Sequence, residues 1–307
     1  MKPSSQHQVV CFGEVLWDIL PTGALPGGAP MNVAYHLKKL GTEPALITRT
    51  GTDDYGKKLL NILSESGVTT KYFQVDYNHS TGLVYANVND HHEVVYDIVY
   101  PSAWDFIEWK NDFTGLPEQA DFFVYGSLTS RNKESRDTLY QLLDIAKTKV
   151  LDINLRPPHF NRPQVEYLLQ RADILKMNQA ELELITGWFG RFENTEDRIK
   201  LMQDRFNIET LIVTMGGDGA MVNDKGTVHR HAGFKVNVAD TIGSGDSFLA
   251  GFIHQLLKGS SVENALEFAS GIGAFIATKQ GACPPYEISQ ITELINFNSQ
   301  QKVQTIL

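Results

Sequence analysis

The stretch Asp240-Thr241-Ile242-Gly243-Ser244-Gly245-Asp246-Ser247-Phe248 decides the fold. It follows a β-like run at 234–239 and leads into an apolar helical run that continues to Leu257. Two glycines at a strand-to-helix turn let backbone N–H groups converge without side chains in the way. A helix N-terminus favours an anion, because its first N–H groups lack intrahelical acceptors and the helix dipole is positive there. The sequence therefore predicts an anion-binding turn between a strand and a helix.

Asp246 places a carboxylate inside this turn. One interpretation is a general base beside a phosphate cradle. The other is that Asp246 only caps a helix starting near Ser247, since Asp is a favoured N-cap residue. An acid inside an anion site is hard to explain by stability alone, so we favour the first interpretation and keep the second open.

Composition limits the class of protein. The chain has 307 residues, of which 42% are hydrophobic and 21% charged, so a sizeable core is expected. The net charge is −9 and no long basic run occurs, which disfavours nucleic-acid binding. The two cysteines form no CxxC pair, and the apolar run at 9–20 is broken by Glu14 and Asp18. No window approaches the roughly 18 apolar residues of a membrane span. These features predict a cytoplasmic protein without a membrane or nucleic-acid partner.

The first half of the chain holds a second glycine turn. A buried strand at 8–14 and an extended run at 15–21 precede Gly27-Gly28-Ala29-Pro30, after which a helix is predicted over 30–40. Asn32 would lie in its first turn, close to the Gly-Gly backbone. A strand is predicted at 44–48.

The stretch 51–58 nearly matches a P-loop. It ends in Lys58 rather than Ser or Thr, and Asp53 and Asp54 inside it would repel phosphate. We therefore predict a loop followed by a helix over 55–66.

Residues 81–88 and 93–99 flank Asn89-Asp90-His91-His92 and predict a β-hairpin. It interrupts a β/α alternation, which favours a lid over a site. An ordinary edge hairpin is the alternative.

From residue 122 onward, strands are predicted at 122–125, 150–153, 174–177 and 210–214, with helices at 132–149, 162–171, 179–186 and 196–206. This alternation predicts a mostly parallel sheet, whose ligands bind at the carboxyl ends of the strands. Polar residues follow those ends and are expected to converge: Asn154, Arg156, Asn178, Glu181, Thr214 and Asp246. Residues 262–279 form one broken helix or a pair, in which Gly271 and Gly273 serve close packing or a flat ligand. A short helix is predicted after residue 287. With no repeat or low-complexity linker, we expect a single domain over 1–307.

Two separated motifs resemble the ribokinase/PfkB family of sugar kinases. Residues 27–34, Gly-Gly-Ala-Pro-Met-Asn-Val-Ala, are similar to its N-terminal signature, and 240–248 are similar to its C-terminal signature. Residues 178–181 and 213–219 also match its NxxE element and nucleotide loop. Within the family, residues 13–18 and 152–157 most resemble bacterial fructokinases.

The resemblance implies an α/β, three-layer ribokinase-like fold with a central mostly parallel sheet and a small β lid, whose strands would lie near 15–25 and 83–100. It implies ATP-dependent phosphorylation of a sugar hydroxymethyl group. Asp246 would take the hydroxyl proton. The amides of Gly243, Ser244, Gly245 and Asp246 would stabilise the transferring phosphoryl group.

The resemblance also implies binding roles. The sugar would contact Asp18, Gly28, Asn32 and Arg156. The phosphates and a hydrated Mg²⁺ would contact Asn178 and Glu181, the latter through water. The nucleotide would contact Thr214, Gly216 and Gly219. Asp240 would lie at a K⁺ site. Some family members pair through their lids and others do not, so a homodimer through the lid is one expectation.

Two positions depart from the family pattern. Ser244 stands where many relatives have Ala, and Ser270 stands where the family has an adenine-side Asn. The predicted reaction is conversion of fructose to fructose 6-phosphate. The alternatives are a kinase for ribose or 2-keto-3-deoxygluconate, a less favoured nucleoside kinase, and a non-catalytic sugar or nucleotide sensor.

Overall fold

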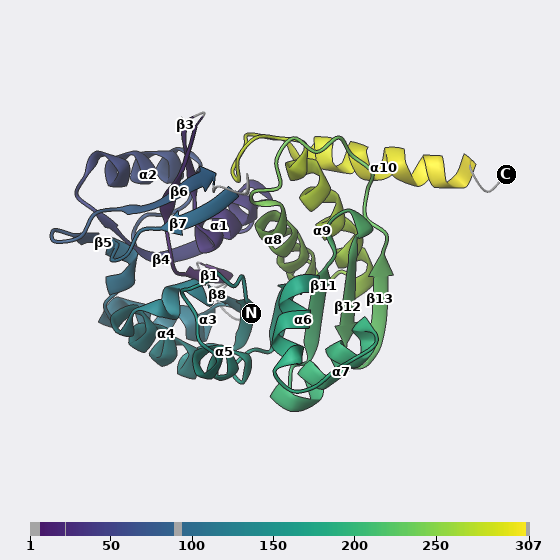
Figure 1. Ribbon diagram of the computed structural model, residues 1–307. Helices are drawn as coiled ribbons and strands as arrows, with labels where there is room; N and C mark the ends of the chain where they lie inside the picture. Colours follow the sequence, from purple (N-terminus) through teal and green to yellow (C-terminus); the bar gives the residue numbers. More distant parts are fainter. Residues whose placement is uncertain (1–6, 22, 89–93, 305–307) are drawn as a thin grey trace. The chain divides into compact units, whose positions relative to one another are not determined.

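The computed structural model describes residues 7–21, 23–88 and 94–304 and divides into two compact units (Figure 1). The first comprises residues 1–147 and 281–283, and the second comprises 148–280 and 284–307. Each is described by itself. The predicted hairpin turn at 89–92 lies outside the described residues.

The first unit has a parallel four-strand group ordered β8-β1-β4-β5. Its strands are β1 (Val9–Phe12), β4 (Pro44–Gly51), β5 (Phe73–Asp76) and β8 (Phe122–Gly126). Every residue of β1 is buried, as expected of a continuous apolar run inside a parallel sheet. The accompanying helices are α1 (Ala29–Lys39), α2 (Asp54–Glu65), α3 (Gly115–Gln119) and α4 (Lys133–Ile145). Short 3₁₀ turns are η1 (Ala103–Phe106), η2 (Asn111–Phe113) and η3 (Leu128–Arg131).

A separate four-stranded sheet in this unit has the order β3-β2-β6-β7. Its strands are β2 (Leu16–Leu20), β3 (Gly23–Gly27), β6 (Gly82–Val88) and β7 (Val94–Ile98). Leu16, Val84 and Ile98 from this sheet form a buried cluster with Trp104 and Leu128. The strands predicted near 15–25 and 83–100 therefore belong to one small sheet.

A buried ion pair fixes the segment that follows β7. Arg131 donates from Nε to Asp105 Oδ1 and from Nη2 to Asp105 Oδ2, both at 2.7 Å. The Arg131 guanidinium also donates to the Val99 carbonyl and lies 4.0 Å from the Trp104 ring centroid. The side chains of Arg131 and Asp105 are 3% and 0% exposed. This bidentate pair ties the end of the small sheet to η1 and η3.

The loop at 51–58 leads into a helix, as predicted. Asp53 caps α2, because its Oδ1 accepts from Gly56 N at 2.9 Å. Its Oδ2 accepts from Thr81 N at 2.7 Å, just before β6. Asp53, whose charge argued against a phosphate site, therefore holds this loop in place through its two hydrogen bonds.

Residues 281–283 return to the first unit from the far end of the chain. His36 on α1 is fully buried, and its Nε2 lies 2.9 Å from the Ala282 carbonyl oxygen. Burial lowers the pKa of His36 to about 4, while the Ala282 carbonyl opposes the shift. His36 is therefore neutral at pH 7 and donates from Nε2 to Ala282.

The neutral His36 should make stability depend on pH. Between pH 6.5 and about 4 the unfolded chain binds a proton that the folded chain excludes, so unfolding free energy falls as pH falls. We expect a loss of up to about 3 kcal/mol between pH 7 and pH 4. His36→Gln keeps a donor near Nε2 and should lose that part of the dependence. Urea unfolding of both proteins at several pH values checks this, and equal slopes would contradict it.

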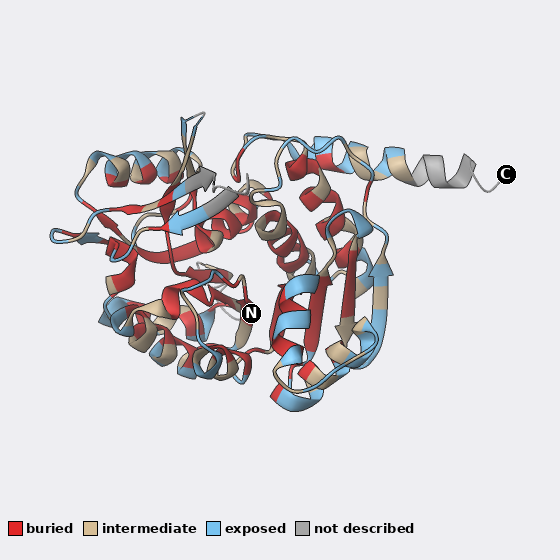
Figure 2. Ribbon diagram, viewed as in Figure 1, coloured by how far each residue is buried: buried red, intermediate tan, exposed pale blue. Residues whose placement is uncertain are grey.

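The second unit has five strands in the order β9-β10-β11-β12-β13. They are β9 (Thr148–Asp152), β10 (Ile174–Asn178), β11 (Thr210–Thr214), β12 (Ala220–Asp224) and β13 (Thr227–His231). The first three are parallel and the last two antiparallel. Figure 2 shows β13 partly exposed, as befits an edge strand, while α8 and α9 carry much buried surface.

The helices of the second unit are α5 (Arg162–Leu169), α6 (Gln179–Gly187), α7 (Thr195–Phe206), α8 (Ser244–Leu257), α9 (Val262–Ala277) and α10 (Ile288–Gln304), with one 3₁₀ turn, η4 (Gly216–Asp218). The predicted α/β class with a mostly parallel sheet is confirmed. For 262–279 we predicted one broken helix or a pair, and the structure instead has a single unbroken helix over Val262–Ala277.

Several local features differ from the predictions. Residues 234–239 form no strand in the described structure. Phe234 is buried against His231, so its apolar surface is covered in an irregular segment, whereas Val238 is 61% exposed. The antiparallel pair β12 and β13 was not predicted, and neither was β5. The helix after residue 287 is long, not short.

Candidate functional site

The glycine turn of the C-terminal signature is a helix start in the second unit. Gly243 is the N-cap residue of α8 with φ 76°, a left-handed conformation that favours glycine, and the helix begins at Ser244. The N-cap interpretation of Asp246 is therefore wrong. The helix begins three residues before Ser247, so Asp246 occupies its third position. Its carboxylate lies in the first turn, where the dipole favours negative charge.

Hydrogen bonds hold this turn in place. Ser244 Oγ donates to the Gly273 carbonyl at 2.9 Å, and Ile242 N donates to Asp240 Oδ1 at 3.0 Å. A Cβ on Gly273 would lie 3.3 Å from Ser244 O, and one on Gly271 would lie 2.5 Å from Ile295. The close-packing interpretation of these glycines is therefore correct. Ser244 uses its hydroxyl to tie the turn to α9.

The NxxE element forms a reciprocal cap at the end of β10. Asn178 Oδ1 accepts from Glu181 N, and Glu181 Oε2 accepts from Asn178 N, each at 2.8 Å. Glu181 Oε1 also accepts from Leu155 N at 2.8 Å, which binds the loop after β9 to the start of α6. Burial raises the pKa of Glu181, although these backbone donors and Lys176 oppose the rise. The structure thus brings Asn178, Glu181 and the loop after β9 together, as predicted.

The predicted nucleotide residues follow β11. Thr214 is the register partner of Asn178, so these two strand ends are adjacent. Gly216 has φ 58° with open space at its missing Cβ. Gly219 has φ 88°, and a Cβ there would collide with the His231 carbonyl. Ser270 is buried on α9, and its hydroxyl has no hydrogen-bond partner in the described structure.

Lys176 is a polar residue at this end of the sheet that the sequence analysis missed. It lies on β10 opposite Asp152 of β9, and its Nζ is 2.7 Å from Asp152 Oδ2. The two side chains are 8% and 6% exposed. In sequence, Lys176 stands in the apolar run Ile174–Met177, where a lone lysine resembles an edge residue. A lysine flanked by apolar neighbours just before the NxxE element was the available signal.

Three of the four predicted sugar residues, Asp18, Gly28 and Asn32, lie in the first unit. Asp18 is on β2 opposite Leu25 of β3, and a Cβ on Gly27 would lie 2.5 Å from Asp18 Oδ2. Asn32 N donates to the Gly28 carbonyl at 2.9 Å, and Gly28 has φ 113°. The structure therefore brings Asp18 to the glycine turn that starts α1, as the motif predicted.

Cys283 contacts the predicted sugar residue Asn32. Its Sγ lies 3.3 Å from Asn32 Oδ1, and Asn32 is 4% exposed. The thiol donates to the amide oxygen of Asn32. Arg156, assigned to the substrate as well, follows β9 in the second unit and is exposed.

Glu181 is the candidate contact for a hydrated metal ion. Among the described residues, no group of three or more His, Cys, Asp or Glu side chains could hold a metal ion. Both Glu181 oxygens accept from backbone N–H groups, but each carries a second lone pair that a metal-bound water can use. Glu181 therefore fits contact with Mg²⁺ through water.

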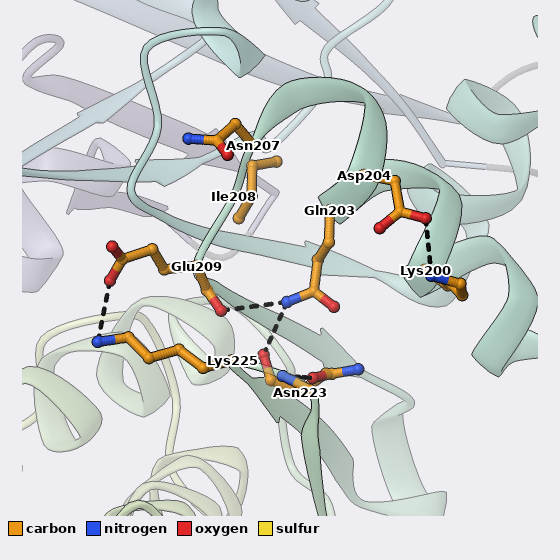
Figure 3. A pocket seen from close by; sticks show the side chains of 9 residues that line it. Lys200, Gln203, Asp204, Asn207, Ile208, Glu209, Asn223 and Lys225 are labelled. Carbon is orange, nitrogen blue, oxygen red and sulfur yellow. Dashed lines mark hydrogen bonds and ion pairs between the residues drawn. The ribbon is translucent and has the colours of Figure 1, made fainter.

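A surface hollow of ≈ 660 Å³ lies at the other end of β11 (Figure 3). Gln203 Nε2 donates to the carbonyl oxygens of Glu209 and Asn223, and Lys225 pairs with Glu209. None of the predicted site residues lines it. It adjoins Thr210, where β11 begins, whereas ligands of parallel sheets bind at the carboxyl ends. We therefore place the candidate site at the Thr214 end of the strand.

No helix in the described part of the chain is both long and apolar enough to cross a membrane.

Residues 9–289 match the family described as pfkB family carbohydrate kinase. Probable fructokinase-7 of Arabidopsis thaliana is 30% identical over 310 residues, which cover 91% of this chain and 90% of that protein. Fructokinase-1 of Oryza sativa subsp. japonica is 29% identical over 305 residues, with 90% and 93% covered.

Solved structures give the same result for the fold. Fructokinase with bound ATP from Xylella fastidiosa aligns with a TM-score of 0.86 at 22% identity, covering 96% of this chain and 100% of that one. A fructokinase double mutant from Vibrio cholerae O395, bound to fructose, ADP and potassium ion, aligns with a TM-score of 0.82 at 23% identity, covering 96% and 100%. These likenesses confirm the three-layer ribokinase-like fold. The chain belongs to the pfkB family of carbohydrate kinases and is a sugar kinase.

Proposed function

We propose that this sugar kinase transfers the γ-phosphate of ATP to the 6-hydroxymethyl group of fructose and so forms fructose 6-phosphate. The observation that carries the proposal is the position of Asp246 in the first turn of α8. That turn follows directly on Gly243, the N-cap residue, whose conformation is left-handed. That arrangement supplies an anion site and a base in one turn. The fructokinase names of the relatives support fructose as the acceptor.

In the proposed reaction, Asp246 accepts the proton of the attacking sugar hydroxyl. A first-turn carboxylate is a weak base, but the loose transition state of phosphoryl transfer allows the proton to leave late. The amides of Gly243, Ser244, Gly245 and Asp246 stabilise charge on the transferring phosphoryl group. Asp18, Gly28 and Asn32 hold sugar hydroxyls, for which a carboxylate is an acceptor and an amide is both a donor and an acceptor.

On the nucleotide side, Asn178 and Glu181 act on the phosphates and the hydrated metal. Thr214, Gly216 and Gly219 line the nucleotide. Mg²⁺, when bound, neutralises charge on the β- and γ-phosphate oxygens. We propose a K⁺ ion beside the Asp240 turn, which Asp240 Oδ1 already orders through Ile242 N. The potassium in the Vibrio cholerae fructokinase structure supports this assignment.

A sugar acid is the second candidate substrate. Arg156 is exposed and can meet a carboxylate as readily as it can meet a phosphate. 2-Keto-3-deoxygluconate carries such a carboxylate, and ribose does not. The exposed Arg156 is the observation that favours this alternative.

A panel of acceptors distinguishes these functions. We expect kcat/KM for fructose to exceed that for ribose and 2-keto-3-deoxygluconate by at least about tenfold, the discrimination that one well-placed contact gives. A coupled ADP-release assay with each sugar measures it. A higher kcat/KM for the sugar acid, lost in Arg156→Gln, would favour the second candidate. Absence of turnover with every sugar would favour the non-catalytic sensor.

We propose that the sheet β3-β2-β6-β7 acts as a lid over the sugar and that two copies pair through it. Tyr85 on β6 and Tyr96 on β7 are 39% and 48% exposed and lie on opposite faces of this sheet, so each face offers one aromatic side chain to a second copy. Light scattering after size exclusion gives the oligomeric state, and a monomer at micromolar concentration contradicts the pairing. Cys11 and Cys283 form no disulfide in the described structure, which supports a reducing, cytoplasmic location.

A further inference from the structure

Lys176 is a buried cation at the carboxyl end of the second unit's parallel strands. Its residue is 7% exposed, and its ammonium pairs with Asp152 at 2.7 Å. A buried ion pair gives little net stability, because desolvation of both charges offsets their attraction. An apolar pair would fill the same space between β9 and β10. The pair therefore calls for a reason other than stability.

The surroundings of the ammonium supply that reason. A Cβ on Gly245 would lie 3.1 Å from Lys176 Nζ, so the ammonium lies directly against the anion-binding turn. Burial acts to lower the pKa of Lys176, but Asp152 and Asp246 outweigh it and raise the pKa. Lys176 is therefore charged at pH 7 and close enough to Asp246 to interact with its carboxylate.

The charge balance of this cluster depends on Lys176. Asp152, Glu181 and Asp246 all interact with its ammonium. Without that cation, an ionised Asp246 would face the other carboxylates and an incoming phosphate across a low-dielectric interior. Gly245 contributes by leaving out the side chain that would displace the ammonium.

We propose that Lys176 is a positioning residue, held by Asp152, whose ammonium supports the Gly243–Asp246 turn and keeps Asp246 a carboxylate during phosphoryl transfer. The inference rests on the proposed role of Asp246 as the base. Lys176 acts through Asp246 and the turn. The competing role is purely structural, in which Lys176 does no more than neutralise Asp152.

Two variants separate the roles. Lys176→Met keeps the side-chain length and removes the charge, but it leaves Asp152 buried without its cation. The double variant Lys176→Met/Asp152→Asn removes both charges and so avoids that penalty. We expect kcat to fall by about 10- to 100-fold in Lys176→Met and to stay low in the double variant, because the turn that carries Asp246 loses the cation that holds it in position and small displacements of reacting groups cost up to about 100-fold. The assay uses the best sugar of the wild-type chain, and circular dichroism checks folding.

The pH profile gives a readout that a structural role would not move. Loss of a nearby positive charge disfavours the carboxylate, so the acid limb of kcat against pH should shift upward by about one to two units in Lys176→Met. The shift should be smaller in the double variant, because Asp152→Asn also removes a negative charge. Lys149→Met is the matched control, because Lys149 pairs with Asp173 at 3.1 Å at the opposite end of the same strands. It should leave kcat and the acid limb unchanged.

A double variant with near-wild-type kcat, or an unmoved acid limb in Lys176→Met, overturns the proposal. A separate measurement tests the role of Asp246 as the base. Normal turnover of Asp246→Asn, with Lys176 unchanged, would contradict that role. If Asp246→Asn is inactive and the double variant is fully active, the base role stands and the Lys176 proposal falls.

Discussion

Asp246→Asn is expected to lower kcat by about 10²- to 10⁴-fold, the usual contribution of a general base. The amide cannot accept the hydroxyl proton, while its size leaves the first turn of α8 unchanged. Asp246 is not the N-cap of that helix, so the substitution removes no capping bond of Gly243. KM for ATP should change little. Steady-state kinetics with ATP and sugar varied separately measures both effects.

Asp197→Asn is a matched control for this variant. Asp197 stands at the same third position of α7, after its N-cap Asn194, in the same unit. It carries the same helix-dipole interaction but lies outside the candidate site. We expect less than a twofold change in kcat. Near-normal turnover of Asp246→Asn, or an equal loss in Asp197→Asn, would remove Asp246 from its proposed role.

Arg131→Met should lower the free energy of unfolding of the first unit by about 3–5 kcal/mol, because it leaves a buried carboxylate without its cation. Asp105 is fully buried, and both of its oxygens accept from Arg131. Asp105 Oδ2 also accepts from Ser102 N at 2.9 Å, which would be its remaining compensation. Urea unfolding at pH 7 measures the loss.

Lys133→Met gives the comparison at an exposed pair nearby. Lys133 pairs with Asp137 on α4, and their side chains are 79% and 47% exposed. Exposed pairs contribute about 0–1 kcal/mol, so this variant should unfold almost as the wild type does. A loss of under 1 kcal/mol in Arg131→Met would show that the buried pair stabilises the unit no more than a surface pair.

The sequence predicted most strongly where periodicity and turn chemistry agree. The buried strand at β1, the α1 start after Gly28 and the αβ alternation from β8 to β11 follow from apolar runs and glycine or proline at their ends. The cap at Asn178 and Glu181 was likewise visible as a polar pair after a strand. The prediction of a single domain over 1–307 stays a prediction.

What the sequence could not give depends on neighbours that are distant in the chain. The run at 234–239 alternates between apolar and polar residues as a strand does. In the structure this segment is irregular, and Phe234 packs against His231. In the sequence, Lys176 is a single charged residue in an otherwise apolar strand. Its burial is explained only by its register partner, Asp152, which the sequence alone does not identify. The exact start of α8 depended on the left-handed φ of Gly243, which also moved Asp246 from the cap into the helix.

The return of residues 281–283 to the first unit has a consequence for synthesis on the ribosome. His36 must wait for Ala282, 246 residues later, and Asn32 must wait for Cys283, 251 residues later. At 5–20 residues per second this delay is roughly 10–50 s. During that time the N-terminal unit emerges with a buried imidazole that lacks its final acceptor. Completion of the first unit is therefore a late event, coupled to the arrival of the C-terminal part of the chain.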